Sequence, residues 1–107
     1  MKPERNISDR IAFLIKIEGL VQGVGFRPFV YRLANELNIT GWIVNRNDAV
    51  VIKAEGTPKA MPLFVENLKT RAPVIAQIDK ITIEHDFPED LKEFLILASQ
   101  DLSAETS

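Results

Sequence analysis

Apolar and polar residues alternate from Phe13 to Gly19, a period of two that is typical of a strand with one buried face. This segment predicts a strand over residues 11–19. The next apolar pattern has a helical period and predicts a helix over residues 28–38. Pro28 fits its first turn, and Asn38 fits its end because asparagine tolerates the left-handed conformation that often follows a helix. The apolar positions of this helix are Val30, Leu33, Ala34 and Leu37.

The next segments predict a hairpin and then a second helix. Residues 41–45 and 49–56 are two short apolar strands, joined by the three residues 46–48. The helix is predicted to begin at Thr57, a capping residue that is followed by Pro58, and to end at residues 71–73.

A fourth strand is predicted over residues 75–85. Its alternation slips between Ile78 and Ile81, which indicates a β-bulge. Residues 92–99 predict a short fifth strand. The order is therefore β-α-β-β-α-β plus one strand. It predicts an α+β, ferredoxin-like sandwich, because right-handed crossovers place both helices on one face of an antiparallel sheet.

The length and amino-acid composition of the chain are typical of one globular domain. The chain has 107 residues, a net charge of −2 and no cysteine. The acidic balance argues against general nucleic-acid binding, and the lack of cysteine excludes disulfides, thiol nucleophiles and cysteine-based zinc sites. No apolar run approaches the ~20 residues of a membrane span and no signal peptide is visible, so we expect a cytoplasmic protein. We expect the domain over residues 11–99, with a flexible arm at 1–10 and a polar tail at 100–107.

The loop between the first strand and the first helix has the features of an anion site. Glycines allow successive backbone N–H groups to point at one spot, and a helix N-terminus adds free N–H groups and partial positive charge. An arginine there offers a planar fork of donors to two phosphate oxygens. The candidate binding residues are Gln22, Gly23, Val24, Gly25, Phe26 and Arg27.

Spacing alone leaves other interpretations open. Glycine-rich turns before helices are common, and an arginine at a helix start is often only solvated. The segment is neither a Walker A loop nor a dinucleotide fingerprint. Asn45, at the end of a predicted strand, could orient an attacking water without repelling an anion, or could simply shape the hairpin.

Two motifs carry a more specific resemblance. The stretches "GLVQGVGFR" (19–27) and "GWIVNRNDAVVIKAEG" (41–56) resemble the acylphosphatase family, and the likeness extends from Ile11 to about Ser99. The resemblance implies that Arg27 binds the phosphoryl group, that Asn45 holds the attacking water and that residues 22–27 form the phosphate cradle. It implies hydrolysis of a carboxylic–phosphoric anhydride without metal or cofactor. Ala49 departs from the family, which usually has glycine there, and this could alter or strain the hairpin.

Further stretches resemble one branch in particular. "GFRPFVYRLA", "RAPVIAQIDKI" and "FLILAS" are similar to the N-terminal acylphosphatase-like domain of the carbamoyltransferases that mature [NiFe]-hydrogenases. The resemblance implies carbamoyl phosphate as substrate. It also implies downstream zinc-binding and nucleotide-handling domains, and a partner protein whose cysteine receives the carbamoyl group through an adenylate. On this interpretation the chain is an isolated first domain that cannot complete the transfer alone.

Three alternatives remain. The chain could be a free-standing acylphosphatase of general acyl phosphates, or a non-catalytic phosphate-sensing or docking domain. It could also be an RNA-binding module, since RNA-recognition domains share the β-α-β-β-α-β order and "VGFRPFV" loosely resembles their aromatic-basic signature. In those modules, however, the signature lies on a central strand, whereas here it is predicted on a loop and a helix.

Overall fold

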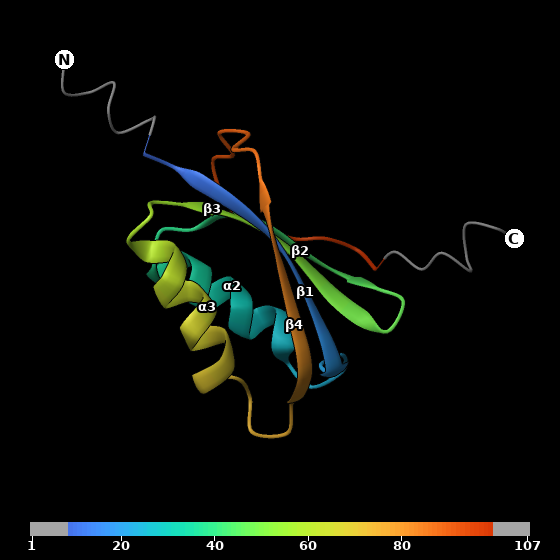
Figure 1. Ribbon diagram of the computed structural model, residues 1–107. Helices are drawn as coiled ribbons and strands as arrows, with labels where there is room; N and C mark the ends of the chain where they lie inside the picture. The colour runs from blue at the N-terminus through green and yellow to red at the C-terminus, as the bar shows by residue number, and fades with distance from the viewer. Residues whose placement is uncertain (1–8, 100–107) are drawn as a thin grey trace, which may run out of the picture.

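The computed structural model describes residues 9–99 of the chain. These residues form five strands and two helices (Figure 1). In chain order they are β1 (Ile11–Leu20), α2 (Phe26–Glu36), β2 (Thr40–Arg46), β3 (Ala49–Gly56), α3 (Ala60–Thr70), β4 (Gln77–Asp86) and β5 (Phe94–Ile96).

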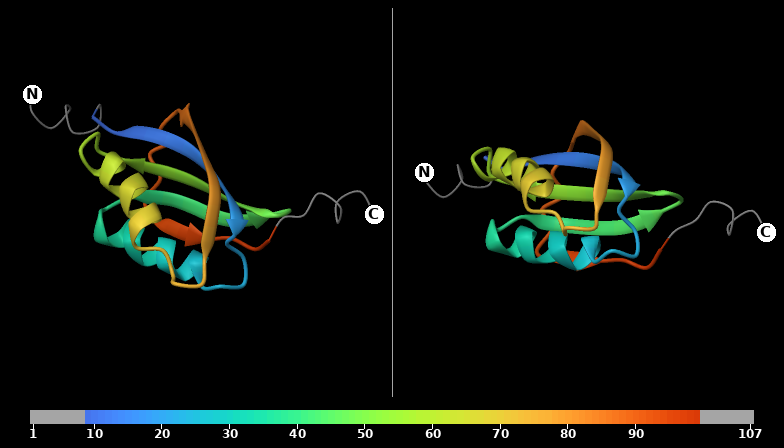
Figure 2. Two further views of the ribbon diagram at one scale, coloured as in Figure 1. Left: turned by 60° about the horizontal axis from the view of Figure 1, so that its bottom comes forward. Right: turned by 90° about the horizontal axis from the view of Figure 1, so that it is seen from below.

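The strands form one sheet in the order β4-β1-β3-β2-β5. The four long strands pair with one another in antiparallel fashion. The short strand β5 pairs with β2 at the edge of the sheet and runs parallel to it. Both helices cover the same face of the sheet (Figure 2). The predicted ferredoxin-like arrangement is thus confirmed. The parallel pairing of β5, which makes the sheet mixed, was not predicted.

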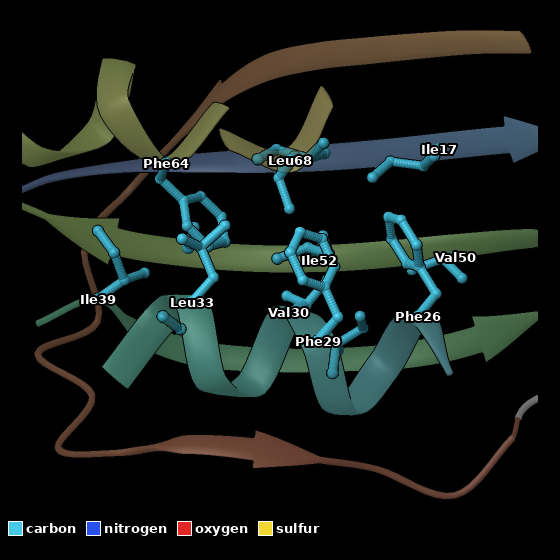
Figure 3. Packing of buried hydrophobic residues seen from close by; sticks show 14 of the residues in the cluster. Ile17, Phe26, Phe29, Val30, Leu33, Ile39, Val50, Ile52, Phe64 and Leu68 are labelled. Carbon is cyan, nitrogen blue, oxygen red and sulfur yellow. The ribbon is translucent and has the colours of Figure 1, made fainter. Parts of the chain in front are cut away.

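The core fills the space between the helices and the sheet. Phe26, Phe29 and Leu33 of α2 meet Phe64 and Leu68 of α3 above the apolar residues of the central strands (Figure 3). The side chains that the strands contribute alternate along each strand, so the opposite, helix-free face carries the intervening positions. On β1 the core positions include Ile15 and Ile17, and on β3 they are Val50, Ile52 and Ala54.

Helix α2 begins at Phe26, two residues before the predicted start. The reason is Gly25, whose left-handed conformation (φ 81°) lets the helix begin directly after it. Pro28 therefore lies at the third helical position, still within the first turn that it tolerates. The helix ends as predicted: Asn38 has φ 58°, and the Ile39 N–H donates to the carbonyl of Ala34 at 2.8 Å in a Schellman-type cap.

Two further predictions of local structure are confirmed. The capping contact predicted for Thr57 is present, since its Oγ1 accepts a hydrogen bond from the Ala60 N–H at 3.1 Å, but α3 begins at Ala60, later than predicted, with Lys59 at the N-cap position. The bulge lies where the alternation slips: Glu18 pairs with Lys80 but Gly19 pairs with Ile78, which leaves Asp79 as the extra residue of β4. The fifth strand is shorter than predicted, because it pairs with β2 over three residues only, opposite Gly41–Ile43.

A buried polar network ties the β4–β5 connection to the helix-free face, at the end of β3 away from the hairpin. The Lys53 ammonium, almost fully buried, donates to Asp86 Oδ2 at 2.9 Å, to the Phe87 carbonyl at 2.9 Å and to Glu89 Oε2 at 3.3 Å. The fully buried Glu55 carboxylate accepts the backbone N–H groups of Glu89 and Leu91.

The predicted arm and tail fall almost wholly on residues 1–8 and 100–107, outside the described part of the chain. At the inner edge of the predicted arm, Arg10 donates to Thr40 Oγ1 at 2.7 Å and to the Glu55 carbonyl at 3.1 Å. Within residues 9–99, neither helix is long and apolar enough to cross a membrane.

Candidate active site

The loop of residues 21–25 connects β1 to α2 and has an open, glycine-dependent conformation. Gly23 and Gly25 have φ values of 75° and 81°, in the left-handed region that disfavours other residues. A Cβ atom at either position would meet no atom within 4 Å. Glycine is therefore favoured here by the backbone conformation and not by crowding. The space that each Cβ would occupy is open.

The N-terminus of α2 has no side-chain cap and no acidic residue in its first turn. The first helical hydrogen bond runs from the Phe29 N–H to the Gly25 carbonyl at 3.3 Å, so the N–H groups of Phe26 and Arg27 precede it. Arg27 is half-buried, and within residues 9–99 its guanidinium takes part in neither an ion pair nor a hydrogen bond. The start of α2 thus combines an arginine, the first N–H groups of a helix and partial positive charge, which are features of an anion site.

Asn45 lies at the same end of the sheet and on the same face. It pairs with Val50, and paired residues of antiparallel strands project to one face. Val50 belongs to the core, where it lies beside Phe26 (Figure 3), so the Asn45 side chain lies on the helix-covered face near the start of α2.

Asn45 is only 8% exposed, and its side-chain Oδ1 is buried without a hydrogen-bond partner among the described residues. Such an oxygen costs about 1–3 kcal/mol unless water or a ligand satisfies it. An asparagine that only shaped a hairpin would use this oxygen in the turn. The geometry therefore favours the water-holding hypothesis over the purely structural one.

Gln22 has a second role that the sequence did not reveal. Its backbone N–H was predicted to belong to the cradle. In the structure its side-chain Nε2 donates to the carbonyls of Asn47 at 2.8 Å and Ala49 at 2.9 Å. The side chain is thus turned toward the β2–β3 hairpin. No local sequence signal could have indicated this contact, which spans more than twenty residues.

The hairpin accommodates Ala49 in place of the family's usual glycine. The residue with positive φ in this turn is Asn47, at 55°, and asparagine tolerates that conformation well. Ala49 is the first residue of β3 and is paired with Arg46. The strain anticipated at Ala49 is therefore absent from this turn.

Two concavities are lined neither by residues 22–27 nor by Asn45. A cavity of about 490 Å³ on the helix-free face is lined by Lys16, Glu18, Arg46 and Asp48 among others, a mixture of charges that does not favour an anion. Another of about 490 Å³ lies between the end of α3 and the start of β4. In the described part of the chain, no group of three or more His, Cys, Asp or Glu residues is arranged to hold a metal ion.

The structure does not support an RNA-binding surface of the kind considered above. Phe26 and Phe29 are 1% and 7% exposed and belong to the core, so they cannot stack on bases. The helix-free face of the central strands β1 and β3 carries no aromatic residue along their described lengths. A stacking platform of the RNA-recognition type is therefore missing from these two strands.

A comparison with protein-family models supplies the family. The acylphosphatase model matches residues 13–96. The chain belongs to the acylphosphatase family. Its relatives include the acylphosphatase of Thermotoga maritima, which is 37% identical over 86 residues, 79% of this chain and 94% of that protein. The crystal structure of the Bacillus subtilis acylphosphatase has a TM-score of 0.78 and 35% identity, and the match covers 81% of this chain and 98% of that one.

Carbamoyltransferases named HypF are also among the relatives. The probable carbamoyltransferase HypF of Methanocaldococcus jannaschii is 40% identical over 92 residues, which cover 85% of this chain. A crystal structure of full-length HypF, in a phosphate- and nucleotide-bound form, matches 86% of this chain with a TM-score of 0.84 and 35% identity. The chain spans 12% of the length of these HypF relatives. It is thus similar to one domain of a multidomain carbamoyltransferase.

Proposed function

We propose that this domain hydrolyses acyl phosphates, with carbamoyl phosphate as its natural substrate. The observation that carries the proposal is the buried Oδ1 of Asn45 near the N-terminus of α2, which bears Arg27; within residues 9–99 neither this oxygen nor the Arg27 guanidinium has a partner. An acyl phosphate already has a good leaving group. The protein therefore needs only to position a water molecule and to stabilise the charge of the phosphoryl oxygens.

In this mechanism the N–H groups of residues 22–27 and the Arg27 guanidinium bind the phosphoryl oxygens. The Asn45 side-chain oxygen accepts a hydrogen bond from the attacking water and orients it toward phosphorus. A bond forms between the water oxygen and phosphorus while the bond from phosphorus to the acyl oxygen breaks. The water's proton passes to a phosphoryl oxygen of the substrate. The products are inorganic phosphate and a carboxylate, which is carbamate when the substrate is carbamoyl phosphate.

The choice of carbamoyl phosphate rests on the likeness to the HypF carbamoyltransferases. In a protein of that kind, downstream zinc-binding and nucleotide-handling domains would pass the carbamoyl group to a cysteine of a maturation partner. The present chain has no cysteine from which a cysteine-based zinc site could be built, so these later steps would need other domains.

The second candidate is a free-standing acylphosphatase that accepts acyl phosphates in general. It is favoured by the small acylphosphatases, such as that of Thermotoga maritima, 94% of whose length is matched. The two candidates share the site and differ in the acyl group, so the substrate profile separates them.

The decisive experiment measures phosphate release from carbamoyl phosphate and from benzoyl phosphate, with spontaneous hydrolysis subtracted. Arg27→Ala and Asn45→Ala are each expected to lower kcat/KM about 100- to 1,000-fold, the usual effect of removing one main electrostatic donor. Arg32→Ala and Asn35→Ala are matched controls, because both residues lie exposed on α2.

Full activity in a folded Arg27→Ala protein would refute the assignment of the site. Hydrolysis of benzoyl phosphate alone would favour the free-standing acylphosphatase. An inactive wild-type chain that still binds phosphate would favour a phosphate-sensing or docking domain.

A further inference from the structure

The Gln22 side chain joins the two halves of the candidate site. Its Nε2 donates to the Asn47 carbonyl at 2.8 Å and to the Ala49 carbonyl at 2.9 Å. A glutamine amide has two N–H donors, and both are accounted for by these acceptors. The Asn47 carbonyl lies in the turn after β2, and the Ala49 carbonyl lies at the start of β3, so both belong to the hairpin that carries Asn45. One side chain thus connects the loop of residues 21–25 to the hairpin that carries Asn45.

The Gln22 side chain connects two parts of the candidate site that are far apart in the sequence. The cradle lies before α2, whereas Asn45 lies after it on β2, and the Gln22 contacts are separated by 25 and 27 residues of sequence. The loop has no regular secondary structure to hold it against the sheet. An error of about 1 Å between reacting groups can lower a rate 100-fold. The relative position of cradle and water site therefore depends on contacts such as these.

The same geometry argues against a direct role for the Gln22 side chain in binding the substrate. Its donors are already directed at the hairpin carbonyls, and the remaining amide oxygen is an acceptor that an anionic phosphoryl group would not favour. What Gln22 can contribute to the phosphate is its backbone N–H. Its side chain acts on the hairpin.

We propose that Gln22 is a positioning residue: its amide sets the distance between the phosphate cradle and the water held by Asn45. This inference rests on the proposed function. It predicts that loss of the amide affects the chemical step more than phosphate binding, because the cradle stays intact while the water is misplaced.

The test compares Gln22→Met, which keeps the length of the side chain but has no donor, with Gln22→Glu, which places acceptors against the two carbonyls. Both are expected to lower kcat about 10- to 100-fold, while the Kd for inorganic phosphate changes less than about threefold. Gln22→Asn keeps the amide one methylene shorter and is expected to give a smaller loss of the same kind. Gln77→Met is the matched control, since Gln77 is exposed at the start of β4.

A double-mutant cycle with Asn45→Ala distinguishes positioning from a merely structural role. Once Asn45 is removed there is no water site to align, so Gln22→Met is expected to cause little further loss of kcat in that background. Equal losses in both backgrounds would overturn the inference, as would a Gln22→Met protein with wild-type kcat. A wild-type chain without acyl phosphate hydrolysis would instead refute the proposed function, and this inference with it.

Discussion

Gly19 and Gly25 have positive φ values of 136° and 81°, but only Gly19 is also crowded by neighbouring atoms. A Cβ atom at Gly19 would lie 2.1 Å from the Gln77 carbonyl oxygen, in the bulge between β1 and β4. A Cβ atom at Gly25 would be strained by a φ of 81° but would meet nothing. Gly19→Ala is therefore expected to destabilise the fold by about 3 kcal/mol or more, and Gly25→Ala by about 1–2 kcal/mol.

Urea unfolding of the two variants and the wild type checks this difference. A second readout separates the roles: Gly25→Ala distorts the cradle and should lower hydrolysis in the folded protein, whereas Gly19→Ala should act through stability. Equal losses of stability in the two variants would contradict the argument from crowding at Gly19.

The candidate site could be proposed from the sequence only where its residues are local. Arg27 and the glycines stand in one short stretch, so a single motif indicated them. Asn45 was indicated by the end of a strand and by the family motif, but its buried, unpartnered oxygen required the packed structure. The Gln22 contact could not be predicted, because it depends on how closely a loop and a hairpin approach in the folded chain.

At the scale of elements, Lys53 is expected to hold the β4–β5 connection on the sheet. Its ammonium faces the carboxylates of Glu55, Asp86 and Glu89 at 4.0, 2.9 and 3.3 Å. Lys53→Met would leave these carboxylates without their cation. Because two of the three carboxylates are partly exposed, we expect the free energy of unfolding to fall by about 2 kcal/mol rather than by the larger value for a fully buried pair. Urea unfolding of Lys53→Met and the wild type measures this difference.

The double variant Lys53→Met/Asp86→Asn provides the control, since removing both charges is less costly than removing one. If the double variant is less stable than Lys53→Met alone, the network does not act through its charges. Hydrolysis should persist in Lys53→Met, because the network lies at the opposite end of β3 from the hairpin.

The same network predicts how stability depends on pH. The hydrogen bond from Lys53 and that from the Phe87 N–H lower the pKa of Asp86 below its usual value of about 3.9. A carboxyl group with a lowered pKa in the folded state stabilises the protein fully above the unfolded-state pKa. This contribution is lost as pH falls from about 4 through the lower, folded-state pKa.

The comparison of wild type with Asp86→Asn isolates this contribution. The difference in unfolding free energy between them should be constant near neutral pH, shrink below about pH 4 and vanish in stronger acid. Gln77→Met, an exposed change on the same strand at a residue that does not ionise, should leave the pH dependence of stability as in the wild type. A difference between wild type and Asp86→Asn that persists unchanged at low pH would show that the pair does not act through ionisation.

The positions of helices and strands were predicted well where the periodicity of apolar residues along a short segment determines them. The alternation of β1 and the helical period of α2 placed the core faces correctly, and the slip in β4 located the bulge. The start of α2 was misplaced by two residues because Gly25 caps it through its backbone conformation. The parallel pairing of β5 could not be predicted, since a strand of three residues carries no signal of its neighbour or direction.

At the scale of the whole molecule, the candidate site should link anion binding to folding. The cradle exists only in the folded chain, because it needs both the loop conformation and the start of α2. A ligand that binds only the folded state stabilises it by RT ln(1 + [L]/Kd). At ten times its Kd, inorganic phosphate is expected to add about 1.4 kcal/mol, or roughly 6 °C in Tm for a domain of this size.

Thermal unfolding at rising phosphate concentration, with chloride at matched ionic strength, measures this linkage. Phosphate also stabilises many proteins weakly because it is excluded from their surfaces, an effect that does not depend on a site. Arg27→Ala separates the two effects: a bound phosphate needs the guanidinium, whereas exclusion does not. Arg27→Ala should therefore lose most of the shift in Tm, and Arg32→Ala should keep it. An equal shift in wild type and Arg27→Ala would mean that phosphate does not bind at this cradle, whatever the chain hydrolyses.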